Sequence, residues 1–184
     1  MGAVSRRTTF AVAFLGSRER YEGASKFMLV EHEKLEILLV EDNPADVELF
    51  ERTVSGPYRL TVAETGAEAV DRLFQRGRFQ SSPRPDVVVL DLNVPFLDGH
   101  QILNIMRLNP SLRSIPAVVF SISDRLDDVQ KTYELGACAY LVKQSSLDET
   151  EKTLSAFANF WMRRVVFPGL TRVPRRDSEG ISSC

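Results

Sequence analysis

Five short apolar runs stand out between residues 35 and 142, and a segment of different periodicity follows each of them. An uninterrupted apolar run predicts a strand buried on both faces of a parallel sheet, whereas alternation predicts a strand with one buried face. The second run alternates and the other four are uninterrupted. The runs cover residues 37–40, 58–63, 87–90, 117–120 and 139–142.

The segments after the runs repeat apolar residues every three or four positions, which predicts one apolar face on a helix. Helix starts are indicated by Asn43 with the proline after it, by Asp124, and by capping-box spacings at residues 65–68 and 146–149. Gly136 indicates the end of a helix. The last helix is expected to run to about Arg164. The expected core faces carry Val47, Phe50 and Val54; Ala67, Val70 and Phe74; Ile102, Leu103 and Met106; and Leu126, Val129 and Tyr133.

Five strands that alternate with five helices through right-handed crossovers predict a parallel sheet with helices on both faces. We therefore expect one α/β domain over residues 35–165. Residues 1–34 are expected to be a disordered N-terminal extension or a mis-assigned start, with Met28 as the alternative first residue, and residues 166–184 a flexible tail. The stretch from Ser5 to Leu15 loosely resembles a twin-arginine or secretory leader, but the chemistry below favours the cytoplasm and no membrane association.

Polar side chains follow four of the apolar runs directly: Glu41 and Asp42, Asp91, Ser121, and Lys143. The carboxyl ends of parallel strands lie at one edge of the sheet, where α/β proteins place their chemistry. An isolated Asp91 would serve equally well as a loop cap. Four such strand ends with complementary chemistry favour a site instead.

The charges in this group suggest how it works. Neighbouring carboxylates repel one another and require a cation, and hard oxygen ligands suit Mg²⁺. Asp91 can act as a nucleophile toward phosphorus and form an acyl phosphate. Lys143 supplies a positive charge for phosphoryl oxygens and Ser121 a hydrogen-bond donor.

Charge and composition exclude several other classes of protein. The net charge is −2, but residues 35–162 carry twelve Lys/Arg against nineteen Asp/Glu, which is a poor match for nucleic acid. Cys138 and Cys184 lack the spacing of a disulfide framework or zinc site, and Cys138 is expected to be a small buried residue.

Four motif blocks occur in order: Leu39-Val40-Glu41-Asp42-Asn43, then 90–95 with Asp98-Gly99, then Phe120-Ser121, then 140–143. As a set they resemble a response-regulator receiver domain (CheY-like) over about residues 35–160. The resemblance implies a flavodoxin-like doubly wound sheet with strand order 2-1-3-4-5.

The resemblance also assigns roles to residues. It implies that Asp91 is the phosphoacceptor and that Glu41, Asp42, Asp91 and the backbone carbonyl of Asn93 bind Mg²⁺. It implies that Ser121 and Lys143 contact the phosphoryl group and that Tyr140 is the aromatic switch residue. The phosphoryl donor would be a phosphohistidine on a sensor histidine kinase or a histidine phosphotransfer protein.

Two features refine the resemblance. The block from Glu41 to Asp46, the loop 93–95 and Phe160-Trp161 are similar to single-domain regulators partnered with phytochrome-type histidine kinases. Gln144 departs from the family, which usually has proline after the lysine, commonly with a cis bond. A cis bond before a non-proline residue costs about 2.5–4 kcal/mol, so a trans loop and a different approach of Lys143 are expected.

The last helix carries apolar residues around most of its circumference, including Phe157, Phe160, Met162 and Val165. One interpretation is a wide stripe that faces the core. The other is a surface for a homodimer or a docked kinase, formed by the fourth helix, fifth strand and fifth helix.

Two further hypotheses compete with a phosphorylated signalling protein that is not an enzyme in its own right. A phosphatase of the haloacid-dehalogenase type would prefer Asp at the position of Asn93 and usually carries a cap insertion. A receiver fold used only as a phosphorylation-independent scaffold would typically lose the acceptor or the acidic pair, and both are present here.

Overall fold

The computed structural model describes residues 34–165 and 167, so the expectations for the remaining N- and C-terminal residues lie outside it. Five parallel strands form one sheet in the order β2-β1-β3-β4-β5, as expected. The strands are β1 (Leu35–Val40), β2 (Tyr58–Ala63), β3 (Val87–Leu90), β4 (Ala117–Ser121) and β5 (Ala139–Val142). The helices are α1 (Pro44–Thr53), α2 (Gly66–Leu73), α3 (Gly99–Leu108), α4 (Leu126–Glu134) and α5 (Leu147–Arg163), with a short 3₁₀ turn, η1 (Gly77–Phe79).

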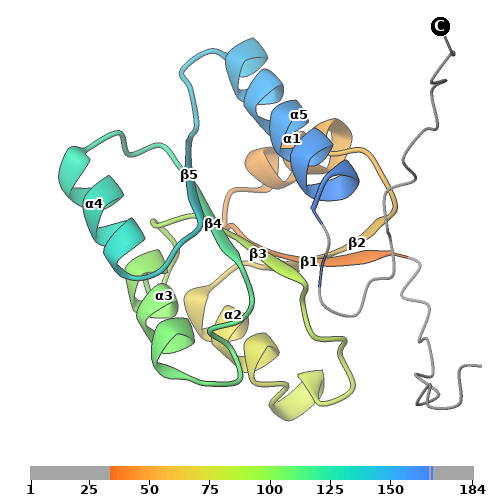
Figure 1. The fold of residues 1–184 in the computed structure, drawn as a ribbon, viewed down its shortest axis with the longest axis vertical. Helices are drawn as coiled ribbons and strands as arrows, with labels where there is room; N and C mark the ends of the chain where they lie inside the picture. The colour runs from red at the N-terminus through yellow and green to blue at the C-terminus, as the bar shows by residue number, and fades with distance from the viewer. Residues whose placement is uncertain (1–33, 166, 168–184) are drawn as a thin grey trace, which may run out of the picture.

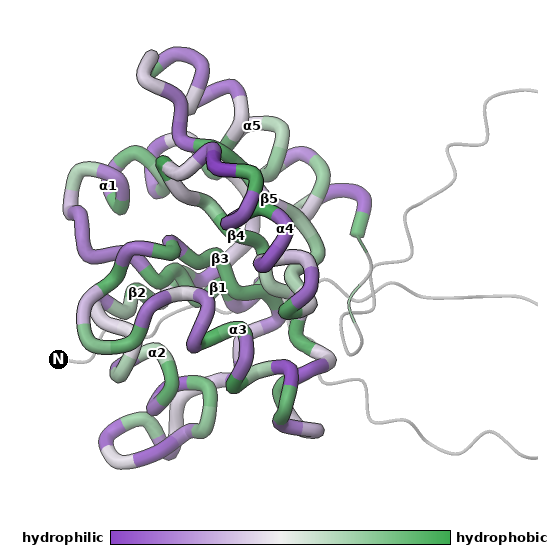
Figure 2. Tube along the Cα trace, turned by 90° about the vertical axis from the view of Figure 1, so that its left-hand side faces the viewer, coloured by the Kyte–Doolittle hydropathy of each residue, from purple (hydrophilic) through white to green (hydrophobic). Residues whose placement is uncertain are grey.

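The helices cover both faces of the sheet, with α1 and α5 on one side and α2, α3 and α4 on the other (Figure 1). A hydrophobic core lies on each face of the sheet, and alternate residues of the central strands pack into one core or the other. Burial on both faces explains the uninterrupted apolar runs of these strands. Val88 and Leu90 of β3 pack toward α2 and α3, whereas Val87 and Val89 pack toward α1 and α5. Hydrophobic residues are accordingly concentrated on the inner strands (Figure 2).

Gly99 allows α3 to begin directly against the end of β3. A Cβ at this position would lie 2.6 Å from the backbone oxygen of Asp91 and 2.8 Å from Cα of Leu92, closer than real Cβ contacts. The backbone N–H of Gly99 donates to the carbonyl of Leu92 at 3.0 Å. This close packing holds the segment that carries Asp91 in place.

Helix caps differ in detail from the expectations. Asn43 caps α1 as predicted, with its side chain accepting from the N–H of Ala45 at 3.0 Å. The reciprocal capping box occurs instead at α3, between Asp98 and Gln101. Thr65 caps α2 through its own side chain, and Ser146 occupies the α5 cap position without a side-chain hydrogen bond. The cap position of α4 is Arg125, so the prediction for Asp124 was wrong.

Two helix faces and one cysteine also differ from expectation. In α2 the fully buried residues are Gly66, Ala69 and Leu73. The expected Val70 and Phe74 are partly buried and pack against the core, whereas Ala67 is exposed. In α4 the only fully covered side chain is that of Thr132. Cys138 is exposed, contrary to prediction. Within residues 34–165, no helix combines the length and apolar character needed to cross a membrane.

Candidate functional site

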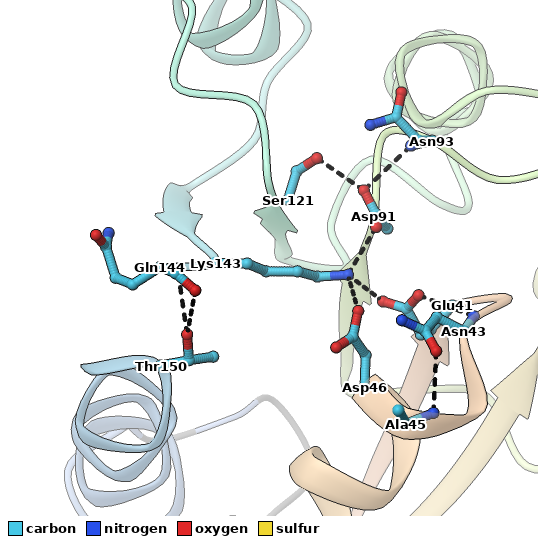
Figure 3. A network of polar contacts seen from close by, with 10 residues as sticks. All are labelled: Glu41, Asn43, Ala45, Asp46, Asp91, Asn93, Ser121, Lys143, Gln144 and Thr150. Carbon is cyan, nitrogen blue, oxygen red and sulfur yellow. Dashed lines mark hydrogen bonds and ion pairs between the residues drawn. The ribbon is translucent and has the colours of Figure 1, made fainter. Parts of the chain in front are cut away.

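Four strand ends deliver the predicted polar side chains to one edge of the sheet. Glu41 follows β1, Asp91 follows β3, Ser121 is the last residue of β4, and Lys143 follows β5. Each of these four residues is buried. Figure 3 shows that their side chains converge, with Lys143 extending across the sheet edge toward Asp91 and Glu41.

The ammonium group of Lys143 lies at the centre of the site. Its Nζ donates to Glu41 Oε2 at 2.6 Å, to Asp91 Oδ2 at 2.7 Å and to Asp46 Oδ2 at 2.9 Å. An ammonium group has three N–H donors, so these three carboxylates occupy all of them. The lysine is therefore the counter-ion of a concentrated negative site.

Asp91 is held through both of its carboxylate oxygens. Oδ1 accepts from the Ser121 hydroxyl at 2.7 Å and from the backbone N–H of Asn93 at 3.1 Å, while Oδ2 accepts from Lys143. Donors on both oxygens fix the orientation of this buried carboxylate. Ser121 is 0% exposed, so its hydroxyl is committed to this contact.

Burial and pairing act in opposite directions on the charged groups. Burial raises the pKa of Glu41, because desolvation outweighs the hydrogen bond from Lys143 and the N–H of Asn43. Burial alone would lower the pKa of Lys143, but its hydrogen bonds to Asp91, Glu41 and Asp46 raise that pKa well above its ordinary value. The lysine is therefore cationic throughout the physiological pH range.

Asp46 is a site residue that the sequence analysis did not assign. It lies in the first turn of α1, and its side chain is 25% exposed, whereas that of Lys143 is 6% exposed. The sequence did contain one indication of this role. Asp46 is five residues after Glu41 and follows Pro44, which starts the helix. Spacing alone did not show that this turn points toward the end of β5.

The predicted metal ligands are partly assembled. Glu41 and Asp91 already share one cation, the Lys143 ammonium, so their oxygens can also face a metal ion in the same place. Asp42 is exposed beside Glu41 at the end of β1. Among residues 34–165 and 167, no group of three or more His, Cys, Asp or Glu side chains is arranged to hold a metal ion while the ammonium occupies the site. The hard oxygen donors fit Mg²⁺ in chemistry, provided that the ammonium gives way.

Tyr140 lies beside the site on β5 and is half-buried. Its hydroxyl donates to the backbone oxygen of Ser123 at 2.8 Å. The Ser123 hydroxyl donates in turn to Asp128 at 2.6 Å in the first turn of α4. Burial raises the pKa of Tyr140. The predicted switch residue is thus connected through the β4–α4 loop to α4.

The loop after Lys143 is held by α5. The described residues contain no cis peptide bond, so the Lys143–Gln144 bond is trans, as expected for a residue other than proline. The Thr150 hydroxyl accepts from the N–H of Gln144 at 3.0 Å and lies 3.1 Å from its carbonyl oxygen. With this trans bond, the Lys143 ammonium still reaches Asp91 at 2.7 Å.

Helices α4 and α5 carry exposed apolar side chains. Leu126 is 83% exposed, Tyr133 50% and Phe160 56%. Phe157, Ala158 and Met162 face the core instead, so the last helix has both a core stripe and an exposed apolar residue. The core stripe of the first interpretation is present, and the homodimer or docking surface of the second stays a prediction.

Comparison with known proteins connects this site to a described family. The model of the response regulator receiver domain matches residues 37–155. Response regulator Rcp1 of Synechocystis is 38% identical over 135 residues, which cover 72% of this chain and 92% of that protein.

Solved structures agree in fold. The phosphorylated cyanobacterial phytochrome response regulator RcpA superimposes with a TM-score of 0.71 at 33% identity, covering 73% of this chain and 99% of that one. The Mn²⁺-bound form of Rcp1 superimposes with the same TM-score, 0.71, at 36% identity over the same shares. The bacteriophytochrome response regulator AtBRR is 35% identical with a TM-score of 0.57, covering 70% of this chain and 95% of that one.

Proposed function

The chain belongs to the response regulator receiver domain family of two-component signalling proteins, and from this we propose that it accepts a phosphoryl group on Asp91. One observation carries the proposal: the two oxygens of Asp91 are bound by the Ser121 hydroxyl and the Lys143 ammonium, both at 2.7 Å. A carboxylate between these two donors is oriented for attack, and the donors are placed to receive phosphoryl oxygens afterwards.

The proposed reaction is a phosphoryl transfer from a phosphohistidine. An oxygen of the Asp91 carboxylate attacks phosphorus, the P–N bond of the donor breaks, and the imidazole leaves with the bonding electron pair and takes up a proton. The product is an acyl phosphate on Asp91. Lys143 and Ser121 then donate hydrogen bonds to phosphoryl oxygens, which spread the added negative charge over two fixed donors.

The proposed cofactor is Mg²⁺, held by Glu41, Asp42, Asp91 and the backbone carbonyl of Asn93. When bound, it neutralises charge on the transferring phosphoryl group. The high density of carboxylates around a single lysine supports this assignment, since an added phosphoryl group would raise the negative charge further. The related protein Rcp1 has been crystallised in a Mn²⁺-bound form, which also supports a divalent metal ion.

The proposed partner is a histidine kinase of the phytochrome type, or a histidine phosphotransfer protein that relays from it. The relatives described as phytochrome response regulators support this assignment. The domain would extend over residues 35–165 and would work in the cytoplasm without binding nucleic acid. Its signal would leave by contact with another protein rather than by enzymatic turnover.

Tyr140 is the proposed link between the site and the outer face. Its hydrogen bond to Ser123 joins the edge near Ser121 to the first turn of α4. Movement of the β4–α4 loop toward a phosphorylated Asp91 would break this bond. The exposed face of α4, β5 and α5 would then change and pair with a second copy.

The deciding experiment is incubation of the full chain with acetyl phosphate and Mg²⁺, followed by intact mass measurement. We expect one phosphoryl adduct that is labile at high pH, as an acyl phosphate is, and that is absent without the metal. Asp91→Asn removes the acceptor oxygen and should form no adduct.

Matched controls separate the acceptor from its neighbours. Asp98→Asn, which changes an exposed capping residue on the next helix, should still form the adduct. An unchanged adduct in Asp91→Asn would place the phosphoryl group elsewhere. No adduct in the wild type would favour the scaffold hypothesis and refute the proposal.

A further inference from the structure

Asp46 holds the Lys143 ammonium from a different element than the other two carboxylates. Glu41 and Asp91 approach Nζ from the ends of β1 and β3, whereas Asp46 approaches from the first turn of α1 (Figure 3). Its Oδ2 lies 2.9 Å from Nζ. Nothing in the proposed phosphoryl transfer requires this third carboxylate.

A divalent cation at the proposed site would compete with the lysine for the same carboxylates. In the structure, Nζ donates to Glu41 at 2.6 Å and to Asp91 at 2.7 Å, and both of these residues are proposed metal ligands. A metal ion that takes these oxygens repels the ammonium and removes its acceptors. A lysine side chain that is only 6% exposed cannot replace them easily with water.

We propose that Asp46 is a positioning residue that retains the Lys143 ammonium when the metal ion takes Glu41 and Asp91. The inference rests on the proposed metal site. Asp46 is suited to this role because it remains an acceptor while the other two carboxylates are engaged. Lys143 thereby keeps a charged partner in both states and stays beside Asp91, where a phosphoryl group arrives.

The start of α1 fixes Asp46 in this position. The Asn43 side chain caps the helix by accepting from the N–H of Ala45 at 3.0 Å, and Pro44 is its first residue. A carboxylate in the first turn is also favoured by the partial positive charge of the helix N-terminus. Asp46 is therefore preorganised and does not depend on the metal ion for its orientation.

Two physical models make different predictions for Asp46→Asn. If Asp46 acts through Lys143, the variant loses the alternative partner of the ammonium, and the metal ion must displace a more tightly held lysine. If Asp46 acts only as one more negative charge, its loss weakens metal binding whether or not the lysine is present. A double-mutant cycle with Lys143→Met separates the two models.

The test is calorimetric titration of the full chain with Mg²⁺ alone, without any phosphoryl donor. We expect Asp46→Asn to weaken Mg²⁺ binding about tenfold, on the scale of one hydrogen bond between charged groups. Glu48→Gln removes an equal charge from an exposed position on the same helix and should change the affinity less than about twofold. In the Lys143→Met background, Asp46→Asn should have no effect beyond that of the control.

A direct measurement covers the case in which Lys143→Met does not fold. The ¹⁵N-labelled ammonium of Lys143 should give a protected NMR signal in the wild type, both with and without Mg²⁺. In Asp46→Asn we expect this signal without Mg²⁺ and its loss by exchange with water once Mg²⁺ is added. A signal that persists in the Mg²⁺-loaded variant would overturn the inference.

The outcomes also distinguish this inference from the proposed function. If the wild type does not bind Mg²⁺, the proposed metal site is wrong and the inference falls with it. If the wild type binds Mg²⁺ and Asp46→Asn binds it equally well, only the role of Asp46 is wrong. An equal loss in the wild-type and Lys143→Met backgrounds would leave Asp46 as a simple charge and would also refute the inference.

Discussion

Removal of the Lys143 ammonium is the perturbation whose energetic cost the structure specifies best. Lys143→Met keeps the length of the side chain but leaves Glu41 and Asp91, with side chains 2% and 7% exposed, without their cation. Removing one partner of a buried ion pair costs roughly 3–5 kcal/mol. We expect about 3 kcal/mol, because the remaining carboxylates keep hydrogen bonds from Asn43, Ser121 and Asn93.

The assay is urea denaturation in the absence of divalent cations, followed through Trp161, the single tryptophan of the chain. Its ring packs against Phe157 and Phe167, so its emission reports on the core between α5 and the sheet. With a slope of about 2 kcal/mol per molar urea, the expected loss shifts the midpoint by about 1.5 M. Lys152→Met, which removes an exposed lysine on α5, should change stability by less than about 0.5 kcal/mol.

The pH dependence of this loss has a definite sign. Burial already raises the pKa of Glu41 in the wild type, and Lys143 opposes that rise. Without the lysine, the folded-state pKa of Glu41 lies higher still, so folding of the variant is accompanied by proton uptake. Stability then increases as the pH falls through the folded-state pKa, and the gain is complete below the unfolded value of about 4.3. The difference from the wild type should therefore shrink as the pH falls toward the unfolded-state pKa of Glu41.

Two results would refute this reasoning. A variant as stable as the wild type at pH 8 would show that the lysine does not compensate the buried carboxylates. A loss of stability that stays constant from pH 8 down to the unfolded-state pKa of glutamate would show that the folded-state pKa of Glu41 is not raised in the variant.

Three further perturbations test the core, the acceptor loop and the outer face. Phe157→Ala removes a ring between Phe50 and Trp161 and should cost about 3–4 kcal/mol in urea denaturation; a loss below about 1 kcal/mol would contradict the described packing. Gly99→Ala adds a Cβ 2.6 Å from the backbone oxygen of Asp91, so adduct formation with acetyl phosphate should slow, and an unchanged rate would show that the loop adapts without cost. Leu126→Asp places a charge on the exposed start of α4 and should abolish dimerisation of the phosphorylated chain in sedimentation while leaving the adduct intact; a monomeric wild type at high concentration, with and without phosphorylation, would remove the dimer from the proposal.

Periodicity located the strands because each central strand is buried on both faces. The runs at 37–40, 87–90 and 117–120 have no polar interruption, and in the structure alternate residues enter the two cores. Parallel strands place their carboxyl ends at one edge, so the convergence of Glu41, Asp91, Ser121 and Lys143 followed from the pattern alone. The order of the strands did not follow from the pattern and came from resemblance to a family.

The sequence predicted less accurately which residues of each helix face the core and which are exposed. In α2, the expected Val70 and Phe74 do pack against the core, but its centre is Ala69 and Leu73 rather than Ala67, with Gly66 in close contact with Leu97. In α4, the apolar residues Leu126 and Tyr133 face outward, because no element of residues 34–165 covers that side. Such choices depend on neighbours that are distant in sequence.

The amino-acid sequence alone determined the fold class, the sheet edge that carries the chemistry, and the acids, hydroxyl and lysine at that edge. Only the tertiary structure decided how they pair. Asp46 and Lys143 are 97 positions apart in the sequence, and their contact depends on how α1 and β5 are placed around the sheet. Local spacing determines which residues share a strand end or a helix face, whereas contacts between distant elements follow from packing of the whole domain.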